Sequence, residues 1–123
     1  MDLVLAVRQS ISRITGLPGA QVHEDGRLLA DFALDSIDLI ELLVELETST
    51  GRRLSMSGFA DYMRGELSQE EFADADGMVT PAAAKRLARV MPQLREQLAS
   101  GPVNSDALLG WFTVANLAAL LDS

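Results

Sequence analysis

The chain has 123 residues, no cysteine, one histidine and a formal net charge of −8. This length fits one domain with its own core, and the composition excludes a disulfide framework, a thiolate metal site, a cysteine nucleophile and a histidine-rich metal site. The acidic balance argues against binding to nucleic acid and favours partners with basic surfaces.

The sequence contains no membrane-spanning or secretory pattern. Its hydrophobic runs fall short of the roughly eighteen residues of a membrane span. The N-terminus lacks the basic region and the apolar length of a signal peptide. We therefore expect a cytoplasmic protein that does not insert into membranes.

The first two predicted helices lie on either side of a polar loop. The first runs over about residues 3–14 and ends at Gly16, and the loop that follows carries His23. The second covers about residues 36–48 and is the clearest helical pattern in the chain. It ends at Gly51.

Hydrophobic residues fall on two sides of this second helix. The core stripe consists of Leu39, Leu42, Leu43 and Leu46. Roughly opposite lie Ile37, Ile40 and Val44, bordered by Asp38, Glu41 and Glu45. Either another part of the chain covers this second stripe, or it is a small hydrophobic ridge with an acidic rim, suited to transient docking on basic partners.

Charge is distributed unevenly along the sequence. Residues 31–50 contain six acidic residues and no Lys or Arg, whereas residues 81–99 contain four basic residues and only Glu96 as an acid. The acidic helix face is therefore the expected docking surface, although an ordinary solvated face is the alternative.

Weaker helical patterns follow at about residues 59–64 and 69–74. Thr80-Pro81 is a strong helix start, and Pro92 either kinks that helix or begins a new segment. A last helix covers about residues 113–121, after the expected core anchors Trp111 and Phe112. Because no strand-like alternation occurs, we predict an all-α bundle. It forms a single domain over residues 1–123, with an inserted helical region at about 57–105.

Ser36 is the main chemical candidate. It lies near the first turn of the second helix, where free backbone N–H groups and the helix dipole favour an attached phosphate. A serine nucleophile needs a positioned general base, and the one histidine, His23, lies in the preceding loop. Asp35 is better placed to cap the helix. We therefore expect a serine that carries a group, in a protein that is not an enzyme.

The residues around Ser36 resemble those of the acyl carrier protein family. Asp35-Ser36-Ile37-Asp38 opens an acidic, leucine-rich helix after a first helix and a long loop. The resemblance covers about residues 3–54 and resumes at residues 112–117, which are similar to the start of the family's last helix. It implies an acyl-carrier-like helical bundle, enlarged here by the inserted segment.

The resemblance also implies a cofactor and a function. A phosphopantetheinyl transferase (holo-ACP synthase) would attach 4'-phosphopantetheine to Ser36, flanked by Asp35 and Asp38. The arm's thiol would carry acyl groups as thioesters. The docking helix would present the partner-binding residues Ile37, Ile40, Glu41, Val44, Glu45 and Glu47.

The implied partners are acyl-loading, condensing and acyl-transferring enzymes with basic docking surfaces, in fatty acid, lipid or polyketide-type biosynthesis. The chain would act as a monomeric, stand-alone carrier. Three alternatives stay open: a peptidyl or aryl carrier, a helical adaptor that is never modified, and a hydrolase that uses Ser36.

Three departures from the family pattern stand out. Ile37 replaces the usual leucine, and Ala33 stands where a glycine is common. The insertion adds roughly fifty residues. We expect it to add a helix pair, especially over residues 80–98, that enlarges the core and offers a second, mildly basic surface. The alternative is a lid over the second hydrophobic stripe or over a bound acyl chain.

Overall fold

The computed structural model describes residues 2–122, and this range contains helices but no β-strand. The α-helices are α1 Leu3–Thr15, α2 Ser36–Thr50, α3 Met56–Arg64, α4 Gln69–Phe72, α5 Pro81–Val90, α6 Arg95–Ser100 and α7 Val114–Asp122. Short 3-10 helices cover Gly19–Gln21, Pro92–Leu94 and Ser105–Trp111. The predicted all-α fold class is confirmed.

Local capping signals explain most helix boundaries. The side chain of Thr80 accepts a hydrogen bond from the backbone N–H of Ala83, and Pro81 occupies the first turn of α5. Gly16 and Gly51 end α1 and α2 in the left-handed conformation, with φ of 77° and 71°. Pro92 begins a new 3-10 segment instead of kinking a continuous helix.

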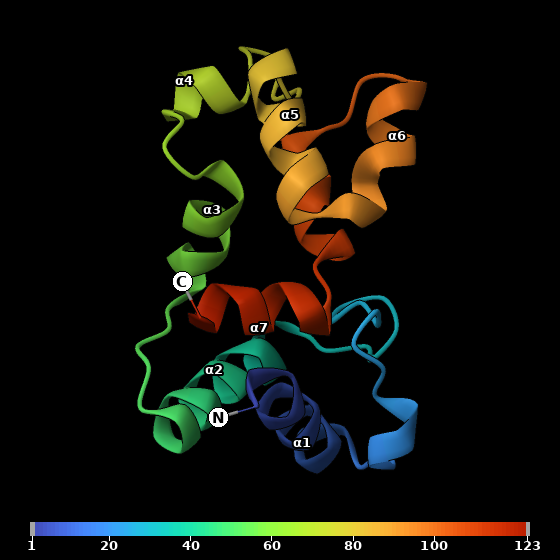
Figure 1. Cartoon of the computed structure of the whole chain (residues 1–123), viewed down its shortest axis with the longest axis vertical. Helices are drawn as coiled ribbons and strands as arrows, with labels where there is room; N and C mark the ends of the chain where they lie inside the picture. The colour runs from blue at the N-terminus through green and yellow to red at the C-terminus, as the bar shows by residue number, and fades with distance from the viewer. Residues whose placement is uncertain (1, 123) are drawn as a thin grey trace.

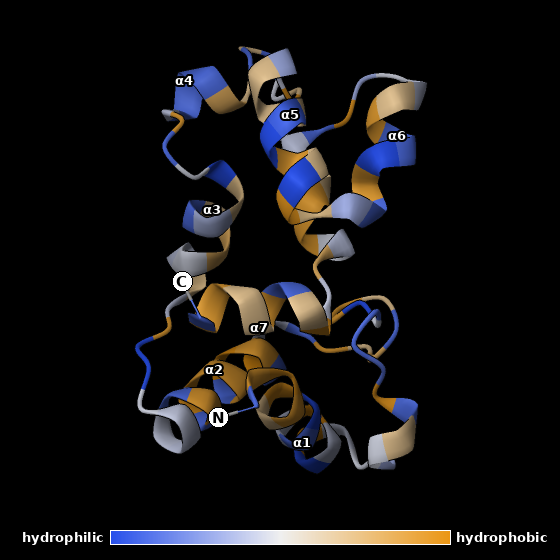
Figure 2. Ribbon diagram, viewed as in Figure 1, coloured by the Kyte–Doolittle hydropathy of each residue, from blue (hydrophilic) through white to orange (hydrophobic). Residues whose placement is uncertain are grey.

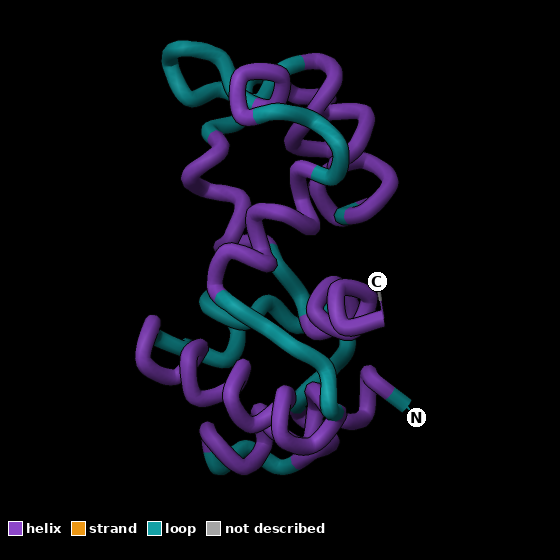
Figure 3. Tube along the Cα trace, turned by 90° about the vertical axis from the view of Figure 1, so that its left-hand side faces the viewer, coloured by secondary structure: helices purple, strands orange, loops and turns teal. Residues whose placement is uncertain are grey.

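The helices form two tiers (Figure 1). The lower tier holds α1 and α2, the upper tier holds α3, α4, α5 and α6, and α7 lies between them. Figure 3 shows the same separation from the side. The upper tier therefore comes from the chain between α2 and α7, where the sequence predicted an insertion.

α7 is buried from both sides because each tier packs against it. Four of its hydrophobic side chains are buried: Val114, Leu117, Ala118 and Leu121. Figure 2 shows α1, α2 and α7 as the most hydrophobic part of the molecule. A helix that is hydrophobic on all sides requires cover on all sides. Here the lower tier covers one side of α7 and the upper tier covers the other.

Aromatic contacts fasten the upper tier to α7. Phe112, directly before α7, is fully buried, and the ring of Phe59 on α3 meets it edge-on at a centroid distance of 4.9 Å. Tyr62, one turn further along α3, meets the same ring at 6.0 Å. The prediction that Phe112 anchors the core is confirmed, and edge-to-face pairs of this kind add about 0.5–1.5 kcal/mol each beyond the buried area.

Candidate functional site

The start of α2 is held by two reciprocal hydrogen bonds. The carboxylate of Asp35 accepts from the backbone N–H of Asp38 at 2.8 Å, and the carboxylate of Asp38 accepts from the backbone N–H of Asp35 at 3.2 Å. This capping box satisfies donors that a helix start otherwise leaves unpaired. The prediction that Asp35 caps the helix is confirmed, and Asp38 completes the cap.

Ser36 is the first residue of α2, and its side chain is exposed. Its hydroxyl makes no hydrogen bond within residues 2–122. The backbone N–H groups of Ser36 and Ile37 likewise have no acceptor in this part of the chain. The site thus offers an accessible oxygen beside two free donors, at the positive end of a helix dipole.

The loop before α2 is fastened to the start of α7. Leu28 N–H donates to Phe112 O at 3.0 Å, and Val114 N–H donates to Gly26 O at 3.0 Å. Arg27 and Thr113 form an isolated antiparallel bridge between these two segments. This pairing could not be predicted from the sequence, because each segment is too short to show a strand pattern.

Close packing inside this loop requires a glycine at position 26. A Cβ atom at Gly26 would lie 2.2 Å from Cζ of Phe32. Phe32 and Leu34 are both buried. The loop is therefore an ordered part of the core that delivers the chain to Asp35, although its polar sequence predicted only a connection.

Ala33 has a φ of 54°, in the left-handed region. This conformation costs an L-residue other than Gly, Asn or Asp roughly 1–2 kcal/mol. The family that the sequence resembles commonly has a glycine at this position. The left-handed backbone conformation explains that preference. This strain lies two residues before the helix cap.

The second hydrophobic stripe of α2 is exposed. The exposed fractions are 74% for Ile37, 52% for Ile40 and 60% for Val44. The opposite stripe is buried, as predicted, and consists of Leu39, Leu42, Leu43 and Leu46. No segment within residues 2–122 covers the exposed stripe, so the expectations that another part of the chain or an inserted lid covers it are wrong.

We call the exposed stripe, together with the exposed acids Glu41 and Glu47, the docking ridge. Glu45 departs from this arrangement, because it is half-buried at the edge of α2 that faces α1 and forms an ion pair with Arg13. It still borders the ridge, but its carboxylate is already partnered within the chain.

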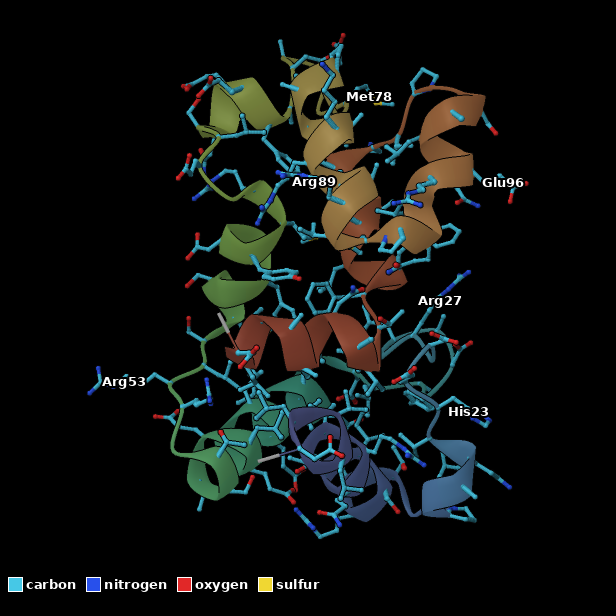
Figure 4. All side chains as sticks on the ribbon, in the orientation of Figure 1. His23, Arg27, Arg53, Met78, Arg89 and Glu96 are labelled. Carbon is cyan, nitrogen blue, oxygen red and sulfur yellow. The ribbon has the colours of Figure 1, made fainter. Side chains whose placement is uncertain are left out.

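Within residues 2–122, no side chain is hydrogen-bonded to the Ser36 hydroxyl as a catalytic base would be. His23 is exposed and points away from the body of the molecule (Figure 4). Within residues 2–122, no group of three or more His, Cys, Asp or Glu residues is arranged to hold a metal ion. None of the helices in this range combines the length and the hydrophobicity that crossing a bilayer requires.

Two contacts near the site were missed from the sequence. The guanidinium of Arg27 lies over the ring of Trp111, 3.9 Å from its centroid, so this half-buried tryptophan stacks with a cation at the junction of loop and upper tier. Asn116 is buried on α7 and accepts from Thr113 N–H at 3.0 Å. The spacing Thr113-x-x-Asn116 is a capping pattern that could have predicted the second contact.

Comparison with known proteins is consistent with this geometry. A family described as "Phosphopantetheine attachment site" matches residues 6–63, from α1 to the end of α3. An "Acyl carrier protein" from Saccharopolyspora erythraea is 35% identical over 51 residues, which are 42% of this chain and 54% of that protein. Over these stretches the chain is similar to the phosphopantetheine attachment family and to an acyl carrier protein.

This similarity supports a covalently attached 4'-phosphopantetheine cofactor and a carrier role. The chain spans about half the length of the curated relative that it matches. No solved structure matches the chain.

Proposed function

We propose that Ser36 carries the phosphopantetheine arm as a phosphodiester. The terminal thiol of the arm holds acyl intermediates as thioesters, and the chain presents them to partner enzymes of fatty acid, lipid or polyketide-type biosynthesis. The observation that supports this proposal is the exposed Ser36 hydroxyl at the first position of a fifteen-residue helix, beside the free N–H groups of Ser36 and Ile37.

The local electrostatics contain opposing contributions at Ser36. The α2 dipole and the two free N–H groups favour a phosphate, whereas the carboxylates of Asp35 and Asp38 repel it. Both carboxylates accept backbone N–H groups, which spreads their charge into the helix cap. Because the site is exposed, water screens the remaining repulsion. The residues present therefore fit an attached phosphodiester.

The docking ridge is the proposed meeting place for partner enzymes. Ile37 is the neighbour of Ser36, and Ile40 and Val44 continue the exposed stripe along α2. A hydrophobic centre of three side chains is small, and the acidic rim adds electrostatic steering towards basic surfaces. These properties suit a carrier that must bind a phosphopantetheinyl transferase and several acyl-handling enzymes weakly and exchange them rapidly.

We also propose that the inserted region and the carrier portion fold as one domain over residues 1–123. The upper tier covers Phe112 and the upper side of α7, both of which would otherwise be hydrophobic surface. The core side chains of both tiers belong to one continuous hydrophobic cluster. The inserted region thus has a structural role, in addition to any surface that it offers.

Intact-mass spectrometry tests the attachment site. The purified chain is incubated with coenzyme A and a broad-specificity phosphopantetheinyl transferase, and we expect a gain of one phosphopantetheine. Ser36→Ala should gain nothing, whereas Ser49→Ala, at the other end of the same helix, should gain the full mass. A modified Ser36→Ala variant would refute the assignment, and an unmodified but folded wild type would favour the adaptor reading.

A further inference from the structure

A basic groove runs along α3 in the upper tier. Two hollows of about 580 Å³ and 790 Å³ follow this helix and share Arg86 as a lining residue. They contain six of the ten Lys and Arg residues of the chain, namely Arg52, Arg53, Arg64, Lys85, Arg86 and Arg89. We define these six residues and the hollows that they line as the basic groove.

Helix periodicity brings the cations of α5 to one wall of the groove. Ala82, Lys85, Arg86 and Arg89 are spaced three and four residues apart, so they share one face. That face lies opposite the C-terminal end of α3, and Figure 4 shows Arg89 between the two helices. The expected basic surface of the insertion is therefore a concave channel between two helices.

Two of the cations are fixed by structural contacts. Arg86 Nη2 donates to Tyr62 O at 2.9 Å, and a Cβ atom at Gly65 would lie 2.7 Å from Arg86 Nε, so only glycine lets the guanidinium lie this close to α3. Arg52 Nη1 donates to Leu121 O at 2.7 Å, at the end of α7. These contacts hold two permanent positive charges in place along the groove.

The other cations are largely unpaired. Arg53, Lys85 and Arg89 are exposed, and they have neither a hydrogen bond nor a carboxylate partner within residues 2–122. Arg64 pairs with Asp61 at 3.1 Å. Asp61 and Glu66 also line the hollows, so six cations face two acids, and the groove keeps an excess of positive charge on a chain whose net charge is −8. Such charge segregation gives electrostatic complementarity to an acidic ligand.

We infer that the basic groove binds an acidic segment of a partner protein. The nine residues of α3 span about 13 Å, which matches about four residues of an extended strand. A flat membrane surface cannot enter a channel between helices, and none of the large exposed hydrophobic side chains lines it. Nucleic acid would meet a molecule that is strongly acidic outside the groove.

This assignment separates the groove from the docking ridge. The ridge lies on α2, in the lower tier of Figure 1, whereas the groove is lined by the connection between α2 and α3, by α3, by α5 and by the end of α7. The two surfaces have opposite charge and do not compete for the same kind of partner. An acidic partner can therefore occupy the groove while a basic enzyme engages α2.

Fluorescence anisotropy of labelled hexaglutamate tests the inference on the full chain. We expect binding in about 0.01 M salt that weakens as salt approaches about 0.15 M, where screening acts over about 8 Å, and no binding of labelled hexaglutamine. In NMR spectra, the amide signals whose chemical shifts change on binding should be those of residues 58–65 and 82–89. Lys85→Gln/Arg89→Gln should weaken binding about two- to thirtyfold, because it removes two exposed charges that face the ligand.

Matched variants separate the groove from general charge. Arg13→Gln/Arg95→Gln removes the same charge elsewhere and should leave the affinity within about twofold, and Lys85→Arg/Arg89→Lys should retain binding. The inference fails if folded wild-type protein does not bind hexaglutamate at low salt, or if both charge-removing pairs weaken binding equally. It also fails if inorganic pyrophosphate binds at these residues and hexaglutamate does not.

Discussion

Asn116 on α7 and Gln93 in the upper tier are joined by a hydrogen bond of 2.7 Å from Gln93 Nε2 to Asn116 Oδ1. The Asn116 amide nitrogen also donates to Val90 O at 3.0 Å, at the end of α5. Gln93 Nε2 donates further to Trp111 O at 3.0 Å. One buried amide thus holds together the cap of α7 and the connection between α5 and α6.

Replacing Asn116 with Leu should destabilise the protein by about 2–4 kcal/mol. The substitution leaves the Val90 carbonyl and the Thr113 N–H without the partner that Asn116 supplies, and each unsatisfied buried group costs about 1–3 kcal/mol. Urea unfolding measures the change. The control is Asn104→Leu, which removes an exposed cap to Asp106 and should cost about 1 kcal/mol. Equal losses in both variants would contradict the bridging role of Asn116.

Ala33→Gly should stabilise the fold by about 0.5–1 kcal/mol. Glycine removes the left-handed penalty of roughly 1–2 kcal/mol at a φ of 54°. It also raises the conformational entropy of the unfolded state, which makes the gain in stability smaller. Thermal or urea unfolding provides the measurement. Ala60→Gly, on an exposed position inside α3, should instead destabilise by about 1 kcal/mol. A loss of stability in Ala33→Gly would show that the strain is not relieved.

Gly26→Ala should destabilise the loop before α2. The added methyl group would overlap the buried Phe32 ring, and overpacking typically costs about 1–3 kcal/mol. Gly19→Ala is the matched control, because its Cβ would meet nothing within 4 Å. Hydrogen exchange of the Leu28 and Val114 amides would show whether the loop detaches from α7. Wild-type protection in Gly26→Ala would contradict this prediction.

The two faces of α2 should respond differently to substitution. Ile40→Gln and Val44→Gln change exposed positions and should alter unfolding free energies by at most about 0.5 kcal/mol, while slowing modification by the transferase. Leu42→Ala empties a fully buried position and should cost about 2–5 kcal/mol. Initial rates at limiting transferase separate the effects. If both ridge variants are modified at the wild-type rate, the docking ridge does not take part in binding the transferase.

Tyr62 should ionise above its ordinary pKa of about 10. Burial raises the pKa of Tyr62, and the nearby Arg86 charge partly opposes this shift. Because the folded-state pKa is raised, its contribution to stability is complete below about pH 10 and is lost as pH rises through the folded-state value. Tyr62→Phe should remove this part of the alkaline destabilisation.

Tyrosinate absorbance reports Tyr62 alone, because the chain has one tyrosine. Arg86→Gln should move the ionisation midpoint higher, since it removes the charge that lowers the pKa. Arg86→Lys keeps the charge and should leave the midpoint close to the wild-type value. A midpoint at or below about 10 in the folded wild type would contradict the effect of burial.

The sequence predicted the parts of the site that depend on local periodicity. The core stripe of leucines and the position of Ile37, Ile40 and Val44 on the opposite side follow from helix geometry within one segment, and the Thr80 cap follows from neighbouring residues. These features need no information about distant parts of the chain.

The tertiary contacts could not be predicted in this way. The pairing of Leu28 with Phe112 joins residues far apart in the sequence, and the backbone strain at Ala33 depends on how the loop is anchored. The basic groove also arises only when α3 and α5 pack together. The sequence indicated its charge, but only the fold makes it concave.

The contact between Arg27 and Trp111 gives this protein a native fluorescence probe. Trp111 is the single tryptophan of the chain, and a guanidinium lies 3.9 Å from its ring centroid. Its emission therefore responds to any separation between the loop that leads to Ser36 and the upper tier. Movement of this loop relative to the upper tier can be followed through one native fluorophore, without an attached label.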